Sequence, residues 1–447
     1  MQTDSNSKAS VFLTAGIAVI LAVIPFHAFL AVWGASIFGH YTLIRLWKDL
    51  LLTVLFVLAV WLVIKNRPLL QAMRKSRLFK LIAAYAFVQI SLGLAGYLRH
   101  DVDRAALGQG LIQDLRLFAM FYASFVAASY SPWLRQHWQK IVLIPASIII
   151  AIGLLQVTAL PNDFLSHFGY GPSTIRPYEL VDQNGGYVRV QSTLRGANPL
   201  GAYLVIVIAA FATLFIGKKF RKKIPNDSLW WFLLVGAASV IVLYFTYSRS
   251  ALLGAIISVG VVTWLCIKNA QIKKWLLIAA AACCLVFGGL VLALRHNAVF
   301  ENTVFHTSEQ SRAKRSSNQD RSTALRVGIH DVAHQPLGRG AGSAGPASVH
   351  NNHPPRIAEN YFLQIGQEAG WLGLAIFLGI YVLVAKELWD RRKDGDGLPI
   401  VLLASLAGLT FVNMLSHAWA DDTLAYLWWG LAGIAIARAS AKQHIAP

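Results

Sequence analysis

Charged residues are scarce in this sequence. Only 14% of its 447 residues are Asp, Glu, Lys or Arg, whereas 56% are hydrophobic. A soluble protein of this length needs a polar surface around its core, and this composition cannot supply one. Apolar runs long enough to cross a bilayer, about 20 residues each, recur along the chain instead. The composition therefore excludes an ordinary soluble protein and predicts an integral membrane protein.

Cysteine is also scarce. Cys266, Cys283 and Cys284 are the only cysteines, and all three lie in apolar runs. This pattern excludes a disulfide framework and a zinc site, and we expect small packing residues. The stretch GRGAG at 338–342 is too short and isolated for a phosphate loop, and the sequence has no dinucleotide-binding fingerprint. We therefore expect neither a metal nor a cofactor.

The apolar runs predict an all-α polytopic membrane protein, because helices satisfy their own backbone hydrogen bonds in lipid. The first run is too long for the apolar part of a signal peptide and is expected to remain as a span. We expect about 12 spans, near residues 10–34, 47–64, 79–97, 106–130, 141–158, 198–216, 229–247, 250–267, 275–294, 359–385, 398–416 and 423–438. The chain then divides into N-terminal transmembrane helices (1–158), a first long outer loop (159–197), central transmembrane helices (198–294), a large outer loop with an amphipathic helix (295–358) and C-terminal transmembrane helices (359–447).

Acidic residues are few beside basic ones, 21 against 40, which gives a formal charge of +19. The basic connections 65–80, 217–227, 267–274 and 386–397 all fall on one side if the spans alternate. The positive-inside rule assigns that side, with both termini, to the cytoplasm of a bacterial inner membrane. Attraction to anionic headgroups accounts for the surplus, so membrane lipids and not nucleic acid are the expected partners.

Arginine and lysine are divided unequally between the two predicted sides. The cytoplasmic side has 15 Lys and 8 Arg and the outer side has 14 Arg and 2 Lys, while Arg116 lies within the fourth run. The rule that sets topology does not distinguish the two residues, but the planar fork of arginine suits phosphate and carboxylate. The outer face is therefore predicted to bind an anion, with drift in composition as the alternative.

The stretch RVQSTLRGANPLG, residues 189–201, ends the first long loop and starts the sixth span. Asn198 is a plausible N-cap of that span, with proline in the first turn. A helix N-terminus with Arg189 and Arg195 beside it is a predicted anion site. Arginines that only reach into the headgroups would give the same pattern.

Two further stretches add polar residues to the outer face. Ser248 and Arg249 lie in a tight turn between spans seven and eight, and an ordinary interfacial turn is the alternative. Residues 320–342 begin with apolar residues at helical spacing and predict a short amphipathic helix that ends near Pro336. Arg321 is a basic candidate on that helix.

The tenth span begins with a polar stripe. Glu359 and Asn360 lie at its outer mouth, and Gln364 and Glu368 follow Asn360 at four-residue spacing. Polar residues in a span face the bundle interior or a wet cavity, and hydrogen bonding between helices is the alternative. Glu359 is the best-placed carboxylate for a general base. His350 and His353 of the preceding loop are rival bases.

Paired acids offer a competing site. Asp101 and Asp103 lie in one short outer turn, and Asp421 and Asp422 lie in the last one. Either pair could bind a divalent ion beside a diphosphate. Helix capping and solvated charge are the more common roles of such pairs.

In chain order, an arginine stretch followed by Asn-Pro, then SRSALLG, PLGRGAG and ENYFLQIGQEAGWLGL resemble the O-antigen ligase and O-antigen polymerase superfamily. The resemblance covers roughly residues 100–435. It implies a metal-independent membrane glycosyltransferase of the GT-C type. Such enzymes pass a glycan from an undecaprenyl-diphosphate carrier to an acceptor sugar on the outer face, in the synthesis of cell-surface polysaccharide.

The resemblance also implies roles for individual residues. Arg189 or Arg195, together with Arg249, would bind the diphosphate, and Arg321 corresponds to a further recurrent arginine. Asn360, Gln364 and Ser248 would support the site. Ligases commonly have His-Asn where Glu359-Asn360 stands here, which favours a polymerase or a ligase-like relative and leaves His350 as the alternative base.

A transporter or flippase of lipid-linked oligosaccharides is the rival interpretation, since twelve spans suit it equally well. It predicts polar residues at mid-membrane and two similar halves of the chain. The polar groups of this sequence gather at the outer face instead, which favours the enzyme.

Overall fold

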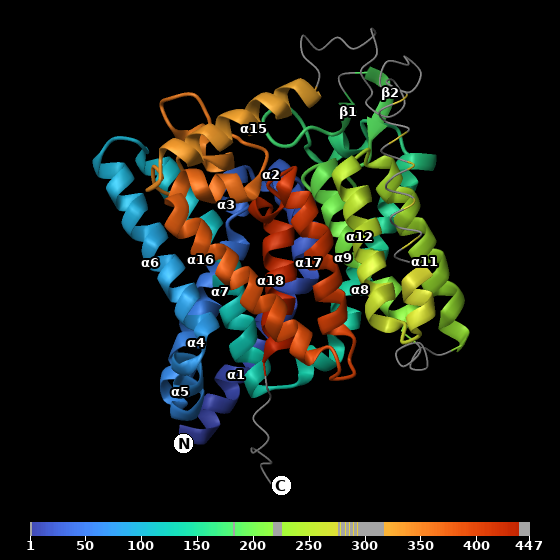
Figure 1. Ribbon diagram of the computed structural model, residues 1–447. Coiled ribbons are helices and arrows are strands. Elements are labelled where there is room, and N and C mark those ends of the chain that lie inside the picture. Colours follow the sequence, from blue (N-terminus) through green and yellow to red (C-terminus); the bar gives the residue numbers. More distant parts are fainter. Residues whose placement is uncertain are drawn as a thin grey trace.

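The computed structural model describes residues 2–181, 184–217, 226–275 and 317–437, with isolated positions between 278 and 293. It is a helical bundle with one small hairpin (Figure 1). The longer helices are α1 (Gln2–Val23), α2 (His27–Phe38), α4 (Trp47–Lys65), α5 (Arg67–Lys75), α6 (Arg77–Leu98), α7 (Arg104–Tyr130), α8 (Trp133–Thr158), α9 (Ala197–Ile216), α11 (Asn226–Phe245), α12 (Arg249–Cys266), α15 (Ser317–His334), α16 (Tyr361–Arg391), α17 (Leu398–Met414) and α18 (Asp422–Ile436). Shorter pieces are η1 (Ile24–Phe26), α3 (Tyr41–Ile44), η2 (Phe164–Phe168), η4 (Gly345–His350) and η5 (Ala418–Ala420), with strands β1 (Glu179–Val181) and β2 (Asn184–Arg189).

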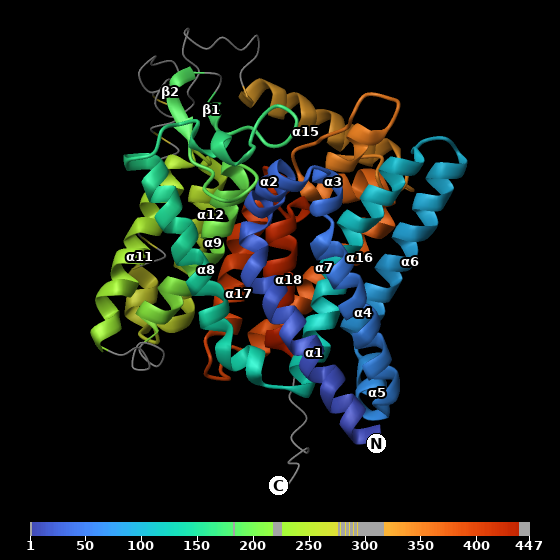
Figure 2. The same ribbon diagram turned by 180° about the vertical axis from the view of Figure 1, so that it is seen from behind.

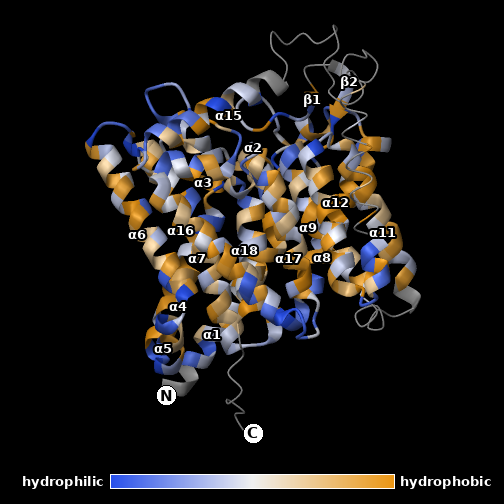
Figure 3. Ribbon diagram, in the orientation of Figure 1, coloured by the Kyte–Doolittle hydropathy of each residue, from blue (hydrophilic) through white to orange (hydrophobic). Residues whose placement is uncertain are grey.

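The fold is that of a polytopic membrane protein. Among the described residues, 8 helices are long and apolar enough to cross a membrane, and two shorter apolar helices cover Leu229–Phe245 and Leu398–Met414. Hydrophobic residues dominate the middle of the bundle, and hydrophilic ones gather at its two ends (Figure 3). The number of twelve spans and the division of the chain that follows from it stay predictions, and the run expected at 275–294 lies mostly outside the described residues.

The two ends of the bundle differ in what they contain. The start of α1, the end of α18 and the basic helix α5 lie at one end, and α15, β1 and β2 lie at the other (Figures 1 and 2). Helix α18 runs through the centre, and every residue from Thr423 to Ile436 is buried. A helix buried all round needs no polar face, which explains why no charged residue follows Asp422 in it.

Three local features differ from the sequence predictions. The first apolar run is broken into α1 and α2 by a 3-10 turn at Pro25, because proline cannot continue the helical hydrogen bonds. The first long loop contains the antiparallel β1–β2 hairpin, which no alternation of apolar and polar residues in the sequence predicted. Helix α9 has Gly196, not Asn198, as its N-cap, so that prediction was wrong by two residues.

The glycine-rich stretch 338–342 packs into a break in α16. Gly370 has a φ of +62°, which opens the helix there. The freed carbonyl oxygens of Gln367 and Glu368 accept the N–H groups of Arg339 and Gly340 at 3.0 and 2.8 Å. A Cβ on Gly340 would meet Leu92 O of α6 at 2.6 Å. Close packing and positive φ therefore explain these glycines, and the broken backbone keeps its hydrogen bonds inside the protein.

A buried ion cluster joins the N-terminal helices to α18. The Asp422 carboxylate contacts Arg116 of α7, lies 3.1 Å from Lys48 Nζ and 3.4 Å from His27 Nε2. Lys48 and Arg116 are almost fully buried, so Asp422 compensates charges that water does not reach. The Asp422 carboxylate is thus engaged by three side chains.

Asp422→Asn is expected to lower the free energy of unfolding by about 3 kcal/mol, because it leaves buried cations uncompensated. The melting temperature of the purified protein measures the loss. Asp394→Asn is the matched control, since the Arg135–Asp394 pair has a 41% exposed carboxylate. An exposed pair contributes less than about 1 kcal/mol. Equal losses in both variants would contradict the structural role of Asp422.

Candidate functional site

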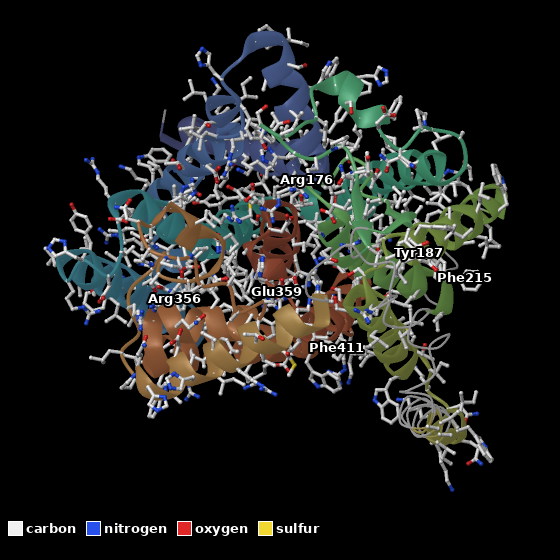
Figure 4. All side chains as sticks on the ribbon, turned by 90° about the horizontal axis from the view of Figure 1, so that it is seen from above. Arg176, Tyr187, Phe215, Arg356, Glu359 and Phe411 are labelled. Carbon is white, nitrogen blue, oxygen red and sulfur yellow. The ribbon has the colours of Figure 1, made fainter. Side chains whose placement is uncertain are left out.

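A cavity of about 200 Å³ lies at the end of the bundle that carries α15 and the hairpin. It is lined by Arg195, Asn198, Pro199, Ala202, Ser248, Ser250, Glu359, Val412, Ser416, His417, Ala418, Asp421 and Leu424. Seen from above, Glu359 lies near the middle of this face (Figure 4). Arg195, Ser248 and Glu359 are far apart in sequence, and the structure brings all three to this one cavity.

Four helices begin at the cavity. The starts of α9, α12, α16 and α18 have the N-caps Gly196, Ser248, Asn360 and Asp421, and each start contributes or adjoins a lining residue. A helix N-terminus exposes N–H groups and is equivalent to roughly +0.5 charge. Four of them around one space favour an anion there.

Glu359 is fixed on both sides. Its Oε2 lies 2.7 Å from Nε of Arg321 on α15, and the two side chains are 38% and 36% exposed. Asn360 follows; its Oδ1 accepts the N–H of Leu363 at 3.0 Å, and its Nδ2 donates to Met414 O at 2.9 Å. The ion pair and the cap thus hold Glu359, at a φ of +50°, over the cavity.

Arg195 is the arginine that lines the cavity with room to bind a ligand. Its side chain is 52% exposed, and its Nε lies 3.5 Å from Oδ2 of Asp421. Only one edge of the guanidinium makes that contact, so other N–H groups remain for a second anion. Arg249 is the first residue of α12 between Ser248 and Ser250, both of which line the cavity, and its own side chain is half-buried.

Arg189, unlike Arg195, does not line this cavity. Its guanidinium donates to Thr246 O at 2.9 Å, Glu179 Oε2 at 3.1 Å and Asn198 Oδ1 at 2.6 Å. These contacts join β2 to β1, α9 and the end of α11. Arg189 borders a separate cavity of about 210 Å³ beside the hairpin, so the structure does not bring it to Glu359.

The residues predicted as alternative bases or metal ligands lie away from the cavity or form hydrogen bonds elsewhere. His350 is exposed and does not line the cavity. His353 Nε2 is 3.0 Å from Asp101 O, and Asp103 Oδ2 accepts the N–H of Asn352 at 2.6 Å. These contacts attach the loop to the α6–α7 turn. Within the described ranges, no group of three His, Cys, Asp or Glu side chains is placed to hold a metal ion.

The polar stripe of α16 faces the interior, as its spacing predicted. Gln364 and Glu368 are 2% and 0% exposed, and Glu368 Oε1 accepts the N–H of Gly342 at 3.0 Å. Asp114 of α7 is fully buried and interacts with Glu368. Gln364 packs against Gly345 and does not line the cavity. These side chains are buried, and none of them lines the cavity.

Sequence reasoning missed His417. It lies in the connection between α17 and α18 and lines the cavity. Burial lowers its pKa, Arg195 and Arg321 lower it further, and Glu359 opposes them. The imidazole is therefore neutral at neutral pH and can accept a proton. Its position in SHAWADD, between the last two apolar runs, was the only signal in the sequence.

The lowered pKa of His417 predicts a pH dependence of stability. Because the unfolded state titrates near 6.5, it binds the proton first as pH falls, so the folded state loses stability below that pH. We expect the melting temperature of His417→Asn to fall less than that of the wild type between about pH 7.5 and about pH 5.5. His350→Asn, at an exposed position, should follow the wild type. Parallel curves for all three proteins would contradict the assignment.

The cavity combines a positive end, made by Arg195 and four helix starts, with Glu359 and a neutral imidazole beside it. Residues 232–378 match the family model described as O-antigen ligase. The matched stretch includes Ser248, Arg249, Arg321 and Glu359. No curated protein matches the chain in a sequence search. The family match, which includes the cavity residues Ser248, Ser250 and Glu359, confirms the resemblance to the O-antigen ligase and O-antigen polymerase superfamily.

Proposed function

We propose that this protein transfers or polymerises a glycan from an undecaprenyl-diphosphate-linked donor onto an acceptor sugar at the cavity. The observation that supports this most is the meeting of Arg195, Glu359 and four helix N-termini around one space. A diphosphate leaving group needs positive charge, and an acceptor hydroxyl needs a base. The cavity offers both.

The reaction would be a direct displacement at the anomeric carbon. The acceptor oxygen forms the new glycosidic bond while the bond from the anomeric carbon to the phosphate oxygen breaks. The acceptor proton passes to Glu359, and the electron pair leaves with the lipid diphosphate. Arg195 and the start of α12, with Ser248 and Arg249, would neutralise the departing charge. Arg321 would orient the Glu359 carboxylate through their 2.7 Å contact.

Arg189 has a supporting role in this proposal. Its three partners fix the start of α9, and Arg195 immediately precedes the N-cap of that helix. His350 is replaced by His417 as the second candidate base, because His417 lines the cavity.

The proposal places the chain in the bacterial cytoplasmic membrane with the cavity on the periplasmic or extracellular face. The basic helix α5, the start of α1 and the end of α18 lie at the opposite end of the bundle, where the positive-inside rule puts the cytoplasm. A carrier lipid in the outer leaflet would then present its diphosphate to Arg195 at the same face of the membrane.

Reconstitution with a lipid-linked oligosaccharide tests the proposal against the transporter. Purified protein in detergent, with donor and a sugar acceptor, should yield a longer or transferred glycan and free lipid diphosphate. A flippase has no product to form without a sealed membrane. Movement of donor across vesicles with no new glycosidic bond would favour the transporter.

Activity is expected to survive chelation of divalent ions, because arginines and helix starts supply the positive charge at the cavity. Transfer rates with and without excess EDTA measure this. Loss of turnover that magnesium or manganese restores would contradict the proposal and return attention to Asp101 and Asp103.

A further inference from the structure

An apolar cavity of about 650 Å³ lies between α4, α5, α6 and α7, away from the proposed site. Its wall includes Phe56, Val63, Leu70, Ile90 and Phe118. Apart from Arg74, Lys80 and the Tyr122 hydroxyl, every lining residue is apolar. Ala83 and Ile90 in this wall are exposed, so the cavity opens to the lipid-facing side of the bundle. Its volume is in the range of ligand pockets, about 300–1,000 Å³.

The depth of the cavity fits one leaflet. Along α6 it extends from Phe79 to Ile90. Eleven helical residues rise about 16 Å, which is about half of the roughly 30 Å hydrocarbon core of a bilayer. The cavity thus reaches from the basic end of the bundle to about the middle of the membrane.

The mouth of the cavity is positively charged. Arg74 and Lys80 line it, and Lys80 also lines a neighbouring apolar cavity of about 600 Å³ with Arg77. The second cavity lies on the other side, between α6 and α16. In the part of the chain that the structure describes, no carboxylate forms an ion pair with Arg74, Arg77 or Lys80.

Helix α5 holds the mouth in place. Asn66 caps it by accepting the N–H of Leu69 at 3.1 Å, and Met73 is buried against the bundle while Arg74 is exposed. A short helix with one apolar and one basic face lies naturally at the membrane interface. Its basic side chains would stand at the level of the headgroups.

We propose that this cavity binds an anionic glycerophospholipid from the leaflet at the α5 end. An acyl chain would occupy the apolar cavity, and the phosphate would lie against Arg74 and Lys80. Basic pockets between transmembrane helices on the cytoplasmic side suit such headgroups. The polyprenyl donor of the proposed function is a separate ligand, whose diphosphate is proposed to bind in the cavity at the opposite end. This inference does not depend on the glycosyltransferase proposal.

The test measures lipid binding and not transfer activity. Delipidated protein in detergent receives phosphatidylglycerol or phosphatidylcholine, and melting temperature and lipid retention by native mass spectrometry are compared. Phosphatidylglycerol should stabilise the wild type more. Its affinity should fall about 5-fold in Arg74→Gln or Lys80→Gln, because each variant removes one contact between a basic side chain and the lipid phosphate. The two losses multiply to about 30-fold in the double variant.

Two further variants separate the cavity from general surface charge. Lys75→Gln removes the same charge from α5 at a position that does not line the cavity, and should retain binding. Ala83→Trp fills the cavity without a charge change and should reduce binding. The proposal is overturned if both lipids bind equally, if Lys75→Gln matches Arg74→Gln, or if Ala83→Trp binds normally. Displacement of phosphatidylglycerol by equimolar undecaprenyl phosphate, or cross-linking of a second copy at Ala83, would also overturn it.

Discussion

Glu359→Gln is expected to slow glycan transfer by about 10²–10⁴-fold, the range typical of a lost general base. The amide is nearly isosteric with the carboxylate but cannot take the acceptor proton at neutral pH. Donor affinity should change little, because Arg195 and the helix starts remain in place. Single-turnover transfer rates and donor binding by the purified variant measure the two effects separately.

Glu179→Gln is the matched control. Glu179 also pairs with an arginine, at 3.1 Å from Arg189, and its carboxylate is 37% exposed, much like that of Glu359. It lies in the hairpin and does not line the cavity. Its variant should keep near-normal turnover. Near-normal turnover in Glu359→Gln would remove that residue as the base and make His417→Asn the next variant to measure.

Much of the arrangement could be predicted from the sequence because it follows from alternation. Spans that begin at the outer face must place their first residues at the same end of the bundle. The predicted starts near Asn198, Ser250, Glu359 and Asp422 therefore belong together, and the structure has the N-termini of α9, α12, α16 and α18 around one cavity. The amphipathic helix predicted from apolar spacing is α15.

The features of the site that could not be predicted from the sequence depend on contacts between segments far apart in the chain. Arg189 and Arg195 look equivalent in RVQSTLRGANPLG, but only the structure shows that Glu179 and Thr246 engage the first. His417 has no local pattern, and its place depends on α9 and α16 packing beside α17. Likewise Gly340 looked like part of a loop, whereas its role is to let the backbone approach α6.

The same difference between the two arginines gives the second large effect. Arg195→Ala should weaken donor binding by about 10- to 100-fold, since a hydrogen bond to a charged group contributes about 1.5–3 kcal/mol. Arg195→Lys keeps the charge but loses the fork, so it should still impair binding. The fold should be preserved in both, because the Arg195 side chain is 52% exposed and, among the residues that the structure describes, forms one ion pair, with Asp421 at 3.5 Å.

Arg189→Ala should behave in the opposite way. It leaves Glu179, Asn198 and the Thr246 carbonyl without their donor, so stability should fall by about 3 kcal/mol or more. Any loss of donor binding should follow the unfolded fraction. Titration of a short-chain polyprenyl diphosphate against each folded variant, with melting curves in parallel, separates the two arginines. Normal donor affinity in an Arg195→Ala, Arg249→Ala double variant would rule out the diphosphate site.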